Sequence, residues 1–144
     1  IQGYVDIENL AQLDGHLQEK ELISKIEDET IRKRVIHVVE ENRRVTDMIN
    51  AMEERNFKKM GELLNQSHES WKNLYEVTGL ELDSIVEGAR LCPSTLGARM
   101  TGAGFSGCAI ALVDKDCIED LNDIVLNYYK EKENTDPTRQ QRLV

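Results

Sequence analysis

The longest regular pattern of hydrophobic and polar positions runs from Ile31 to about Arg55. Apolar side chains recur there at intervals of three and four residues, with Glu and Arg between them; they are Val35, Val38, Val39, Val45, Met48, Ile49 and Met52. This spacing places the apolar side chains on one face of a helix. The segment is therefore predicted to form a long amphipathic helix.

Two further helices are predicted to follow. Asn56 is suited to cap a helix, because its side-chain oxygen can accept a hydrogen bond from an unpaired backbone N–H. The next segment carries an apolar face and is predicted to end near Tyr75; the face consists of Phe57, Met60, Leu63, Leu64, Ser67, Trp71 and Leu74. After Thr78-Gly79 a shorter helix stops before Pro93, with Leu82, Ile85, Val86 and Ala89 on one face. Three successive helices favour packing against a flat partner.

The flat partner is predicted to be a small antiparallel sheet. Leu96 to Thr101 forms a short strand candidate, and the continuous apolar run from Ala109 to Val113 is suited to a strand buried on both faces. Glycines separate the two strands. Helices followed by a hairpin indicate an α+β fold, with the helices packed on one face of the sheet, rather than a doubly wound sheet.

A last helix is predicted after the hairpin, with Asp114 placed to cap its start. Apolar residues hold helical spacing over three turns; they are Cys117, Ile118, Leu121, Ile124, Val125 and Tyr128. The first 30 residues are acidic and show no pattern that assigns them to an element. The charged tail from Lys130, broken by Pro137, is expected to be extended or frayed.

Composition restricts the class of protein. The chain has 144 residues, of which 40% are apolar and 31% charged, and this fits one soluble globular domain spanning residues 1–144. The formal charge of −9, without a basic cluster, argues against nucleic acid as a partner. The longest uninterrupted apolar run, Cys108 to Val113, is far shorter than the ~18 residues of a membrane-spanning helix. No membrane partner is expected.

The three cysteines are Cys92, Cys108 and Cys117. They form no CxxC pair and stand beside no histidine at metal-ligand spacing, so they are expected to be reduced core thiols in a cytoplasmic protein. The chain opens on Ile1, without an initiator methionine or a signal segment. It is therefore expected to be a piece of a longer protein, in which a site shared between domains would be only half present here.

The strongest candidate for chemistry is the glycine-rich segment from Gly97 to Cys108. Four of the nine glycines fall within it. Such a loop can bring backbone amides close to an anion because no side chain stands in the way, although a tight hairpin would also explain the glycines. No lysine follows in the Walker pattern. Gly102-x-Gly104-x-x-Gly107 matches a dinucleotide fingerprint, but a strand rather than a helix follows it.

Two other candidates lack support. Adjacent residues on a helix do not face each other, so Ser67-His68 is not expected to form a nucleophile and base, and no acid is placed to orient the imidazole. His37 and His68 are instead expected on helix surfaces or at an interface. Asp114-Lys115-Asp116 begins like a calcium loop, but it lacks the glycine and glutamate that such a loop requires later. No metal site is predicted.

Several segments together resemble a known family. Gly97 to Val113, reading GARMTGAGFSGCAIALV, resembles the third signature of the GHMP kinases, and its GARMTGAGF opening is similar to that of the galactokinases. His37 to Val45 is similar to the family segment HVV-x-EN-x-RV. Asn65 to Ser70, Tyr75 to Thr78 and Glu81 to Asp83 resemble its N-x-SH-x-S, YEVS and ELD segments. These occur in family order over about residues 30 to 115.

The resemblance implies the C-terminal domain of a galactokinase, which transfers the γ-phosphate of ATP to the C1 hydroxyl of galactose. The family's sugar-binding segment, GLSSSA phosphate loop, catalytic aspartate and catalytic arginine belong to an N-terminal domain absent from this chain. ATP and Mg²⁺ would be bound mainly there, and this piece is expected to contain no catalytic residue and to be inactive alone. Its implied contribution is a loop facing the nucleotide phosphates, made of Gly102, Ala103, Gly104, Phe105, Ser106 and Gly107.

The same resemblance leaves alternatives open. A related kinase acting on galacturonate or N-acetylgalactosamine would carry similar segments, as would a galactokinase-like sensor that binds ATP and sugar without catalysis. Two features depart from the family pattern. Ser106 stands where a glycine is usual, and the tail from Asn134 to Arg142 is polar where the family has a strand with a glycine-rich end.

Overall fold

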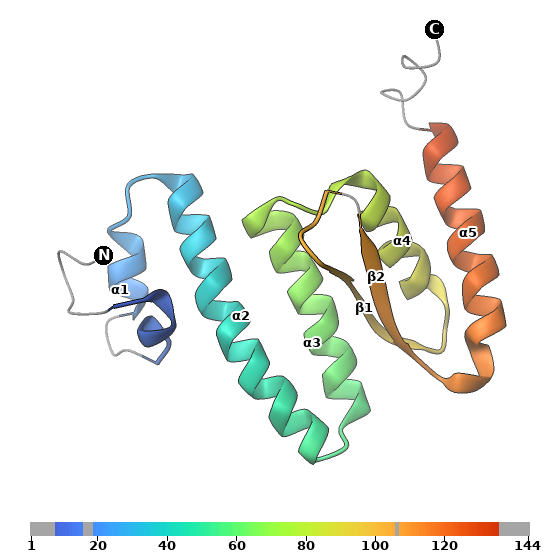
Figure 1. Ribbon diagram of the computed structural model, residues 1–144, viewed down its shortest axis with the longest axis horizontal. Coiled ribbons are helices and arrows are strands. Elements are labelled where there is room, and N and C mark those ends of the chain that lie inside the picture. The colour runs from blue at the N-terminus through green and yellow to red at the C-terminus, as the bar shows by residue number, and fades with distance from the viewer. Residues whose placement is uncertain (1–7, 16–18, 106, 136–144) are drawn as a thin grey trace, which may run out of the picture.

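Figure 1 shows a row of helices interrupted by one hairpin, in a computed structural model that describes residues 8–15, 19–105 and 107–135. In the described residues the α-helices are α1 (Glu19–Ser24), α2 (Glu29–Glu53), α3 (Phe57–Ser70), α4 (Gly79–Leu91) and α5 (Ile118–Thr135). The strands are β1 (Thr95–Thr101) and β2 (Cys108–Val113). Short 3-10 turns η1 (Leu10–Leu13) and η3 (Lys115–Cys117) and a π-helical turn η2 (Trp71–Tyr75) complete the elements.

The predicted helices are confirmed, together with the cap predicted at Asn56. The Asn56 side chain accepts a hydrogen bond of 3.0 Å from the backbone N–H of Lys59, so it caps α3 as expected. Asp28 caps α2 by accepting from Ile31. The helical path after α3 continues through the π-turn to Tyr75, which is the predicted end.

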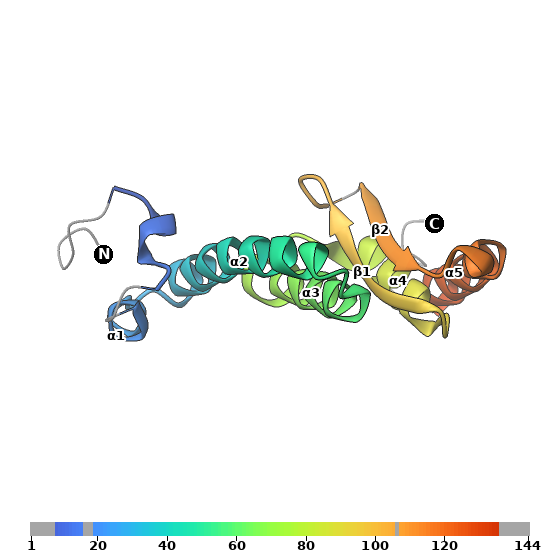
Figure 2. The same cartoon turned by 90° about the horizontal axis from the view of Figure 1, so that it is seen from below.

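The predicted α+β fold is also confirmed. β1 and β2 form an antiparallel pair, with Ala98 opposite Ala111 and Met100 opposite Ala109. Seen from below (Figure 2), this hairpin lies across one side of the layer that contains α3 and α4. Ala98 and Met100 belong to β1, and both are buried where the hairpin packs on these helices.

The expectation that Ala109–Val113 is buried on both faces is wrong. None of the β2 residues is fully buried, and Ile110 is 48% exposed. Within the described part of the chain β2 pairs only with β1; α3 contacts the sheet mainly through β1, and α4 packs on part of β2. A long apolar run therefore forms a largely uncovered strand here.

Two glycines set how closely α3 approaches β1. A Cβ on Gly61 would lie 2.2 Å from the carbonyl oxygen of Leu96, and a Cβ on Gly97 would lie 2.0 Å from the carbonyl oxygen of Gly61. Neither position has room for a side chain. Backbone therefore packs directly on backbone at this crossing.

The last helix follows Asp114, whose side chain accepts from the N–H of Asp116 at the predicted cap position. α5 packs on α4 and continues to residue 135, so the expectation of an extended or frayed tail is wrong for residues 130–135. Its last turns are anchored because the Tyr128 hydroxyl donates to Glu87 at 2.9 Å and Lys132 lies 4.0 Å from the same carboxylate. Residues 136–144, including most of the polar tail, lie outside the described residues.

The first described residues pack against α2. Leu13 and Leu22 form a small core with Val35 and Val39. Arg43 ties this segment to α2 through Asp14 at 2.7 Å and Glu19 at 2.9 Å.

Of the three cysteines, which are all free thiols, only Cys92 is buried; Cys108 is exposed and Cys117 is intermediate. The expectation of core thiols therefore holds for Cys92 alone, because Cys108 begins the uncovered strand β2 and Cys117 precedes α5. None of the helices in residues 8–15, 19–105 and 107–135 is both long and apolar enough to cross a bilayer.

Candidate functional site

The glycine-rich candidate forms the turn between β1 and β2. Gly102 and Gly104 both have φ of +86°, and Phe105 has φ of +60°. Residues with a side chain rarely adopt this left-handed backbone conformation, which explains glycine at 102 and 104. Ala103 and Gly107 are exposed, and Phe105 is 72% exposed. Ser106 lies outside the described residues, so the effect of its replacing a glycine stays a prediction.

The turn is fastened to the segment that follows η2. The backbone N–H of Phe105 donates to the carbonyl oxygen of Val77 at 2.7 Å. A Cβ on Gly104 would lie 2.3 Å from that same oxygen. Gly104 is thus required both by its φ and by this close approach. The hydrogen bond from the Phe105 amide to Val77 therefore fixes the position of the loop.

The segment before Val77 is in turn held by α2. Glu76 has φ of +62°. Its carboxylate forms ion pairs with Arg34, at 2.9 Å, and with Lys33, at 3.6 Å. The hydrogen bond from Arg34 holds the pKa of the Glu76 carboxyl below its ordinary value. Arg34 also donates to the carbonyl oxygen of Leu74 and lies over the ring of Tyr75.

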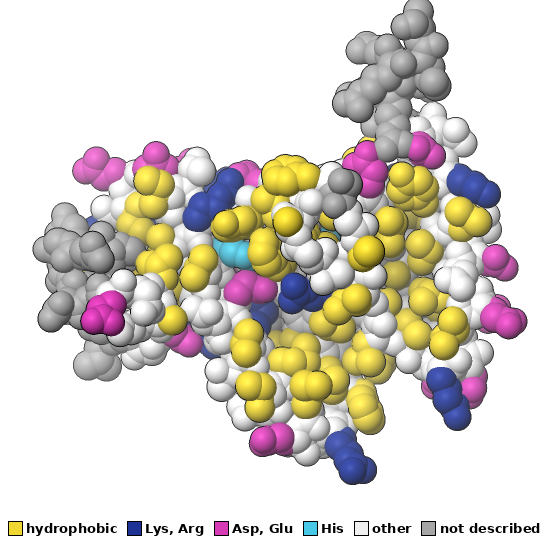
Figure 3. Space-filling view, in the orientation of Figure 1, with side chains coloured by type: hydrophobic (Ala, Val, Ile, Leu, Met, Phe, Trp, Pro, Cys, Tyr) yellow, Lys and Arg dark blue, Asp and Glu magenta, His cyan; other side chains and the backbone are white. Residues whose placement is uncertain are grey.

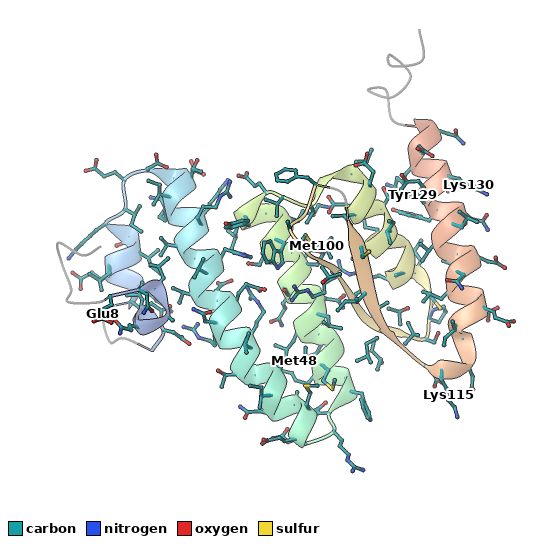
Figure 4. The ribbon with its side chains drawn as sticks, viewed as in Figure 1. Glu8, Met48, Met100, Lys115, Tyr129 and Lys130 are labelled. Carbon is teal, nitrogen blue, oxygen red and sulfur yellow. The ribbon has the colours of Figure 1, made fainter. Side chains whose placement is uncertain are left out.

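A buried histidine contacts the end of β1 just before the loop. His68 is 1% exposed, and its Nδ1 accepts a hydrogen bond of 3.2 Å from the N–H of Met100. Its Nε2 lies 3.3 Å from Asp83 Oδ1, and the other Asp83 oxygen lies 3.2 Å from Lys72 Nζ. Figure 4 labels Met100 between α3 and the hairpin.

These contacts correct two expectations. His68 is buried rather than at a helix surface, and an acid, Asp83 on α4, does face its ring. Burial raises the pKa of Asp83, but the contacts with His68, Thr78 and Lys72 outweigh burial and lower it overall. The conclusion against a Ser67–His68 pair stands, because the Ser67 hydroxyl donates instead to Glu41 at 2.7 Å.

Asn65 makes the equivalent contact one turn earlier on α3. Its Oδ1 accepts from the N–H of Ala98 at 3.0 Å and from Arg90 Nε at 2.8 Å. Arg90 also donates to Glu69 at 2.7 Å, and this bond holds the pKa of Glu69 below its ordinary value. Two side chains of α3, Asn65 and His68, thus accept from alternate amides of β1.

His37 is also buried, so it is not on a helix surface; it lies instead at an interface, the one between α2 and η2. It is 3% exposed, and its Nδ1 lies 2.8 Å from Ser70 Oγ. Its ring packs against Trp71 and Tyr75 with centroids 4.5 and 4.7 Å away. Burial lowers the pKa of His37. His37 therefore packs α2 against η2 and is not part of the glycine-rich site.

Away from the loop, an apolar groove of about 590 Å³ lies between β2, α4 and α5. Ile110, Ile118, Leu126 and Tyr129 are among its lining residues. In Figure 3 hydrophobic side chains gather over this part of the surface. Within the described ranges, no three histidine, cysteine, aspartate or glutamate side chains come together in a group that could hold a metal ion.

Four of the five motif segments quoted above meet at one place. Asn65 and His68 bind β1, Asp83 faces His68, and Val77 binds the loop. The family model for the GHMP kinases C terminal matches residues 48–131, which include all of these contacts. The chain belongs to the GHMP kinase family, with the fold of its C-terminal domain.

Within that family the chain is similar to galactokinases. It is 45% identical over 138 residues to the galactokinase of Staphylococcus carnosus, covering 96% of this chain and 35% of that protein. The galactokinase of Staphylococcus saprophyticus is 46% identical over 132 residues, covering 92% of this chain and 34% of its own length.

A solved structure agrees with this. The crystal structure of Lactococcus lactis galactokinase complexed with galactose matches with a TM-score of 0.82 and 46% identity, over 90% of this chain and 33% of that one. The chain thus spans about a third of the length of the relatives it matches.

Proposed function

We propose that this chain is the C-terminal domain of a galactokinase, which transfers the γ-phosphate of ATP to the C1 hydroxyl of galactose. The observation that carries the proposal is the 45% identity to a galactokinase over 96% of the chain. The match to a galactokinase crystallised with galactose supports the sugar. The remaining two thirds of the enzyme would supply the catalytic residues.

The contribution of this chain is the loop of Gly102, Ala103, Gly104, Phe105, Ser106 and Gly107. Phosphoryl transfer depends mainly on positioning and on stabilising charge, so a rigid loop of backbone amides is useful beside the phosphates. The anchoring of Phe105 on Val77 supports this role, because the loop need not reorganise when the phosphates arrive.

Mg²⁺, when bound to the nucleotide, neutralises negative charge on the phosphates. Among the described residues no three histidine, cysteine, aspartate or glutamate side chains form a group that could hold a metal by themselves; beside a nucleotide, Mg²⁺ needs only one or two carboxylates together with the phosphates. On the resemblance to galactokinases, ATP and Mg²⁺ are expected to be bound mainly by the rest of the enzyme. This chain then acts only through the loop and the elements that fix it.

An assay of ADP release tests the proposal. The full-length protein and the 144-residue chain are each mixed with ATP, Mg²⁺ and galactose, galacturonate or N-acetylgalactosamine. The full-length protein should release ADP with galactose, and the chain alone should stay at background. Faster ADP release with another sugar would identify that sugar, rather than galactose, as the substrate. No turnover with any sugar would favour a sensor, and turnover by the chain alone would contradict the assignment of catalysis to other residues.

A further inference from the structure

We propose that His68 is a positioning residue for the glycine-rich loop, acting through its hydrogen bond to the Met100 amide. The inference rests on the proposed function, since it assigns the loop a role in phosphoryl transfer. The polar contacts of His68 with Met100 and Asp83 both lie outside the loop. Its effect passes through the last part of β1, from which the loop departs at Gly102.

The protonation of the ring follows from its two contacts. Because Nδ1 accepts from Met100 N at 3.2 Å, Nδ1 carries no proton, and the ring proton is on Nε2. Nε2 faces Asp83 Oδ1 at 3.3 Å. The imidazole thus presents an acceptor to the strand and turns Nε2 toward the acid without a hydrogen bond of good geometry, at a site where only 1% of the side chain is exposed.

The surrounding groups make this orientation a stable one. Asp83 is held from its other side by Lys72 at 3.2 Å, and Lys72 also contacts Glu87 at 3.1 Å. The ring therefore lies between a fixed acid on α4 and the backbone of β1. Turning the ring by 180° about Cβ–Cγ would place Cδ2–H, which cannot accept a hydrogen bond, opposite the Met100 N–H and would leave that buried donor without its partner.

The position along the strand explains why the loop would respond. Met100 is 0% exposed and lies two residues before Gly102. The other loop attachment, Phe105 to Val77, holds only the far side of the turn. Loss of the Met100 bond leaves the near side paired with β2 at Thr101 and Cys108 but without this tie to α3, and a displacement of about 1 Å in a catalytic site can lower the rate by about 10²-fold.

Two substitutions of the same histidine separate positioning from packing. His68→Asn places an amide oxygen close to the position of Nδ1 and keeps an acceptor for Met100. His68→Gln places its amide near Nε2 and loses that acceptor. In the full-length protein with ATP and galactose, His68→Gln should lower kcat by roughly 10-fold or more with KM changed less than about twofold. His68→Asn should retain kcat within about threefold. Equal losses in the two variants, or a loss confined to KM, would overturn the proposal.

Two measurements do not depend on kinase activity. Hydrogen exchange of the peptide spanning residues 98–108 should be faster in His68→Gln than in the wild type, and close to wild type in His68→Asn. Nitrogen-15 NMR of the wild-type histidines should identify His68 as the Nε2–H tautomer, which needs no variant to fold. An Nδ1–H tautomer, or unchanged exchange in His68→Gln, would overturn the role of His68. Absence of kinase activity in the wild type would instead overturn the proposed function.

Discussion

Replacing the two left-handed loop glycines by alanine should have different effects, because only one of them is in contact with the backbone of another segment. Gly102 and Gly104 share φ of +86°. A Cβ on Gly102 would meet nothing within 4 Å, whereas a Cβ on Gly104 would lie 2.3 Å from the Val77 oxygen. Gly102→Ala is therefore a matched control that carries the backbone strain without the overlap.

The magnitudes follow from these geometries. Placing alanine in the left-handed region costs roughly 1–2 kcal/mol in either variant. In Gly104→Ala the loop must also move away from Val77, which breaks the 2.7 Å bond from Phe105 and leaves a largely buried carbonyl without its donor. That loss adds about 1–3 kcal/mol. Gly104→Ala should thus be less stable than Gly102→Ala by about 1–3 kcal/mol.

Urea unfolding of the two purified variants measures this difference directly. In the full-length enzyme, ADP release with galactose should also fall further for Gly104→Ala, since its loop is displaced from the position fixed by Val77. Equal unfolding free energies for the two variants would show that the overlap with Val77 is relieved without cost. The close approach would then not be the reason for glycine at 104.

Three further outcomes are expected. Gly61→Ala should lower the unfolding free energy by about 1–3 kcal/mol, although alanine normally favours a helix, because its Cβ would lie 2.2 Å from the Leu96 oxygen; equal or higher stability in urea would contradict the packing. Asn65→Leu should cost about 1–3 kcal/mol in the same assay, since it removes an acceptor shared by a β1 amide and Arg90. Arg90 lowers the pKa of Glu69, so this pair stabilises the fold at neutral pH, and its contribution is lost as pH falls below about 4.3. Between pH 6 and pH 3 the melting temperature should fall less for Glu69→Gln than for the wild type. An equal fall in the two proteins would refute the link between this ion pair and stability.

The parts of the fold that depend on neighbouring residues could be predicted from the sequence. Asn56 and Asp114 cap helices because each side chain bonds an amide two or three residues ahead. The hairpin could also be predicted, because glycines separate two apolar segments. The burial of Ala109–Val113 was predicted wrongly, because an apolar run indicates a tendency to be covered and carries no information on what covers it.

The candidate site divides in the same way. Glycines at 102 and 104 indicated a tight hairpin or a loop open to an anion; that both would adopt left-handed φ is visible only in the structure. Its partner Val77 and the acid facing His68 lie on other elements, so no local pattern could pair them. A signal for the burial of His68 was present, since His68 lies one helical turn after Leu64 on the predicted apolar face.

The contacts of Asn65 and His68 have a consequence for assembly. A strand at the border of a sheet normally offers a row of unused N–H groups to any passing chain. Here side chains of α3 already occupy the amides of Ala98 and Met100 on the border of β1 that faces away from β2. The sheet can therefore grow in one direction only, beyond β2. Intermolecular strand addition, the first step toward aggregation, is blocked on the β1 side by two side chains rather than by a proline or a lysine.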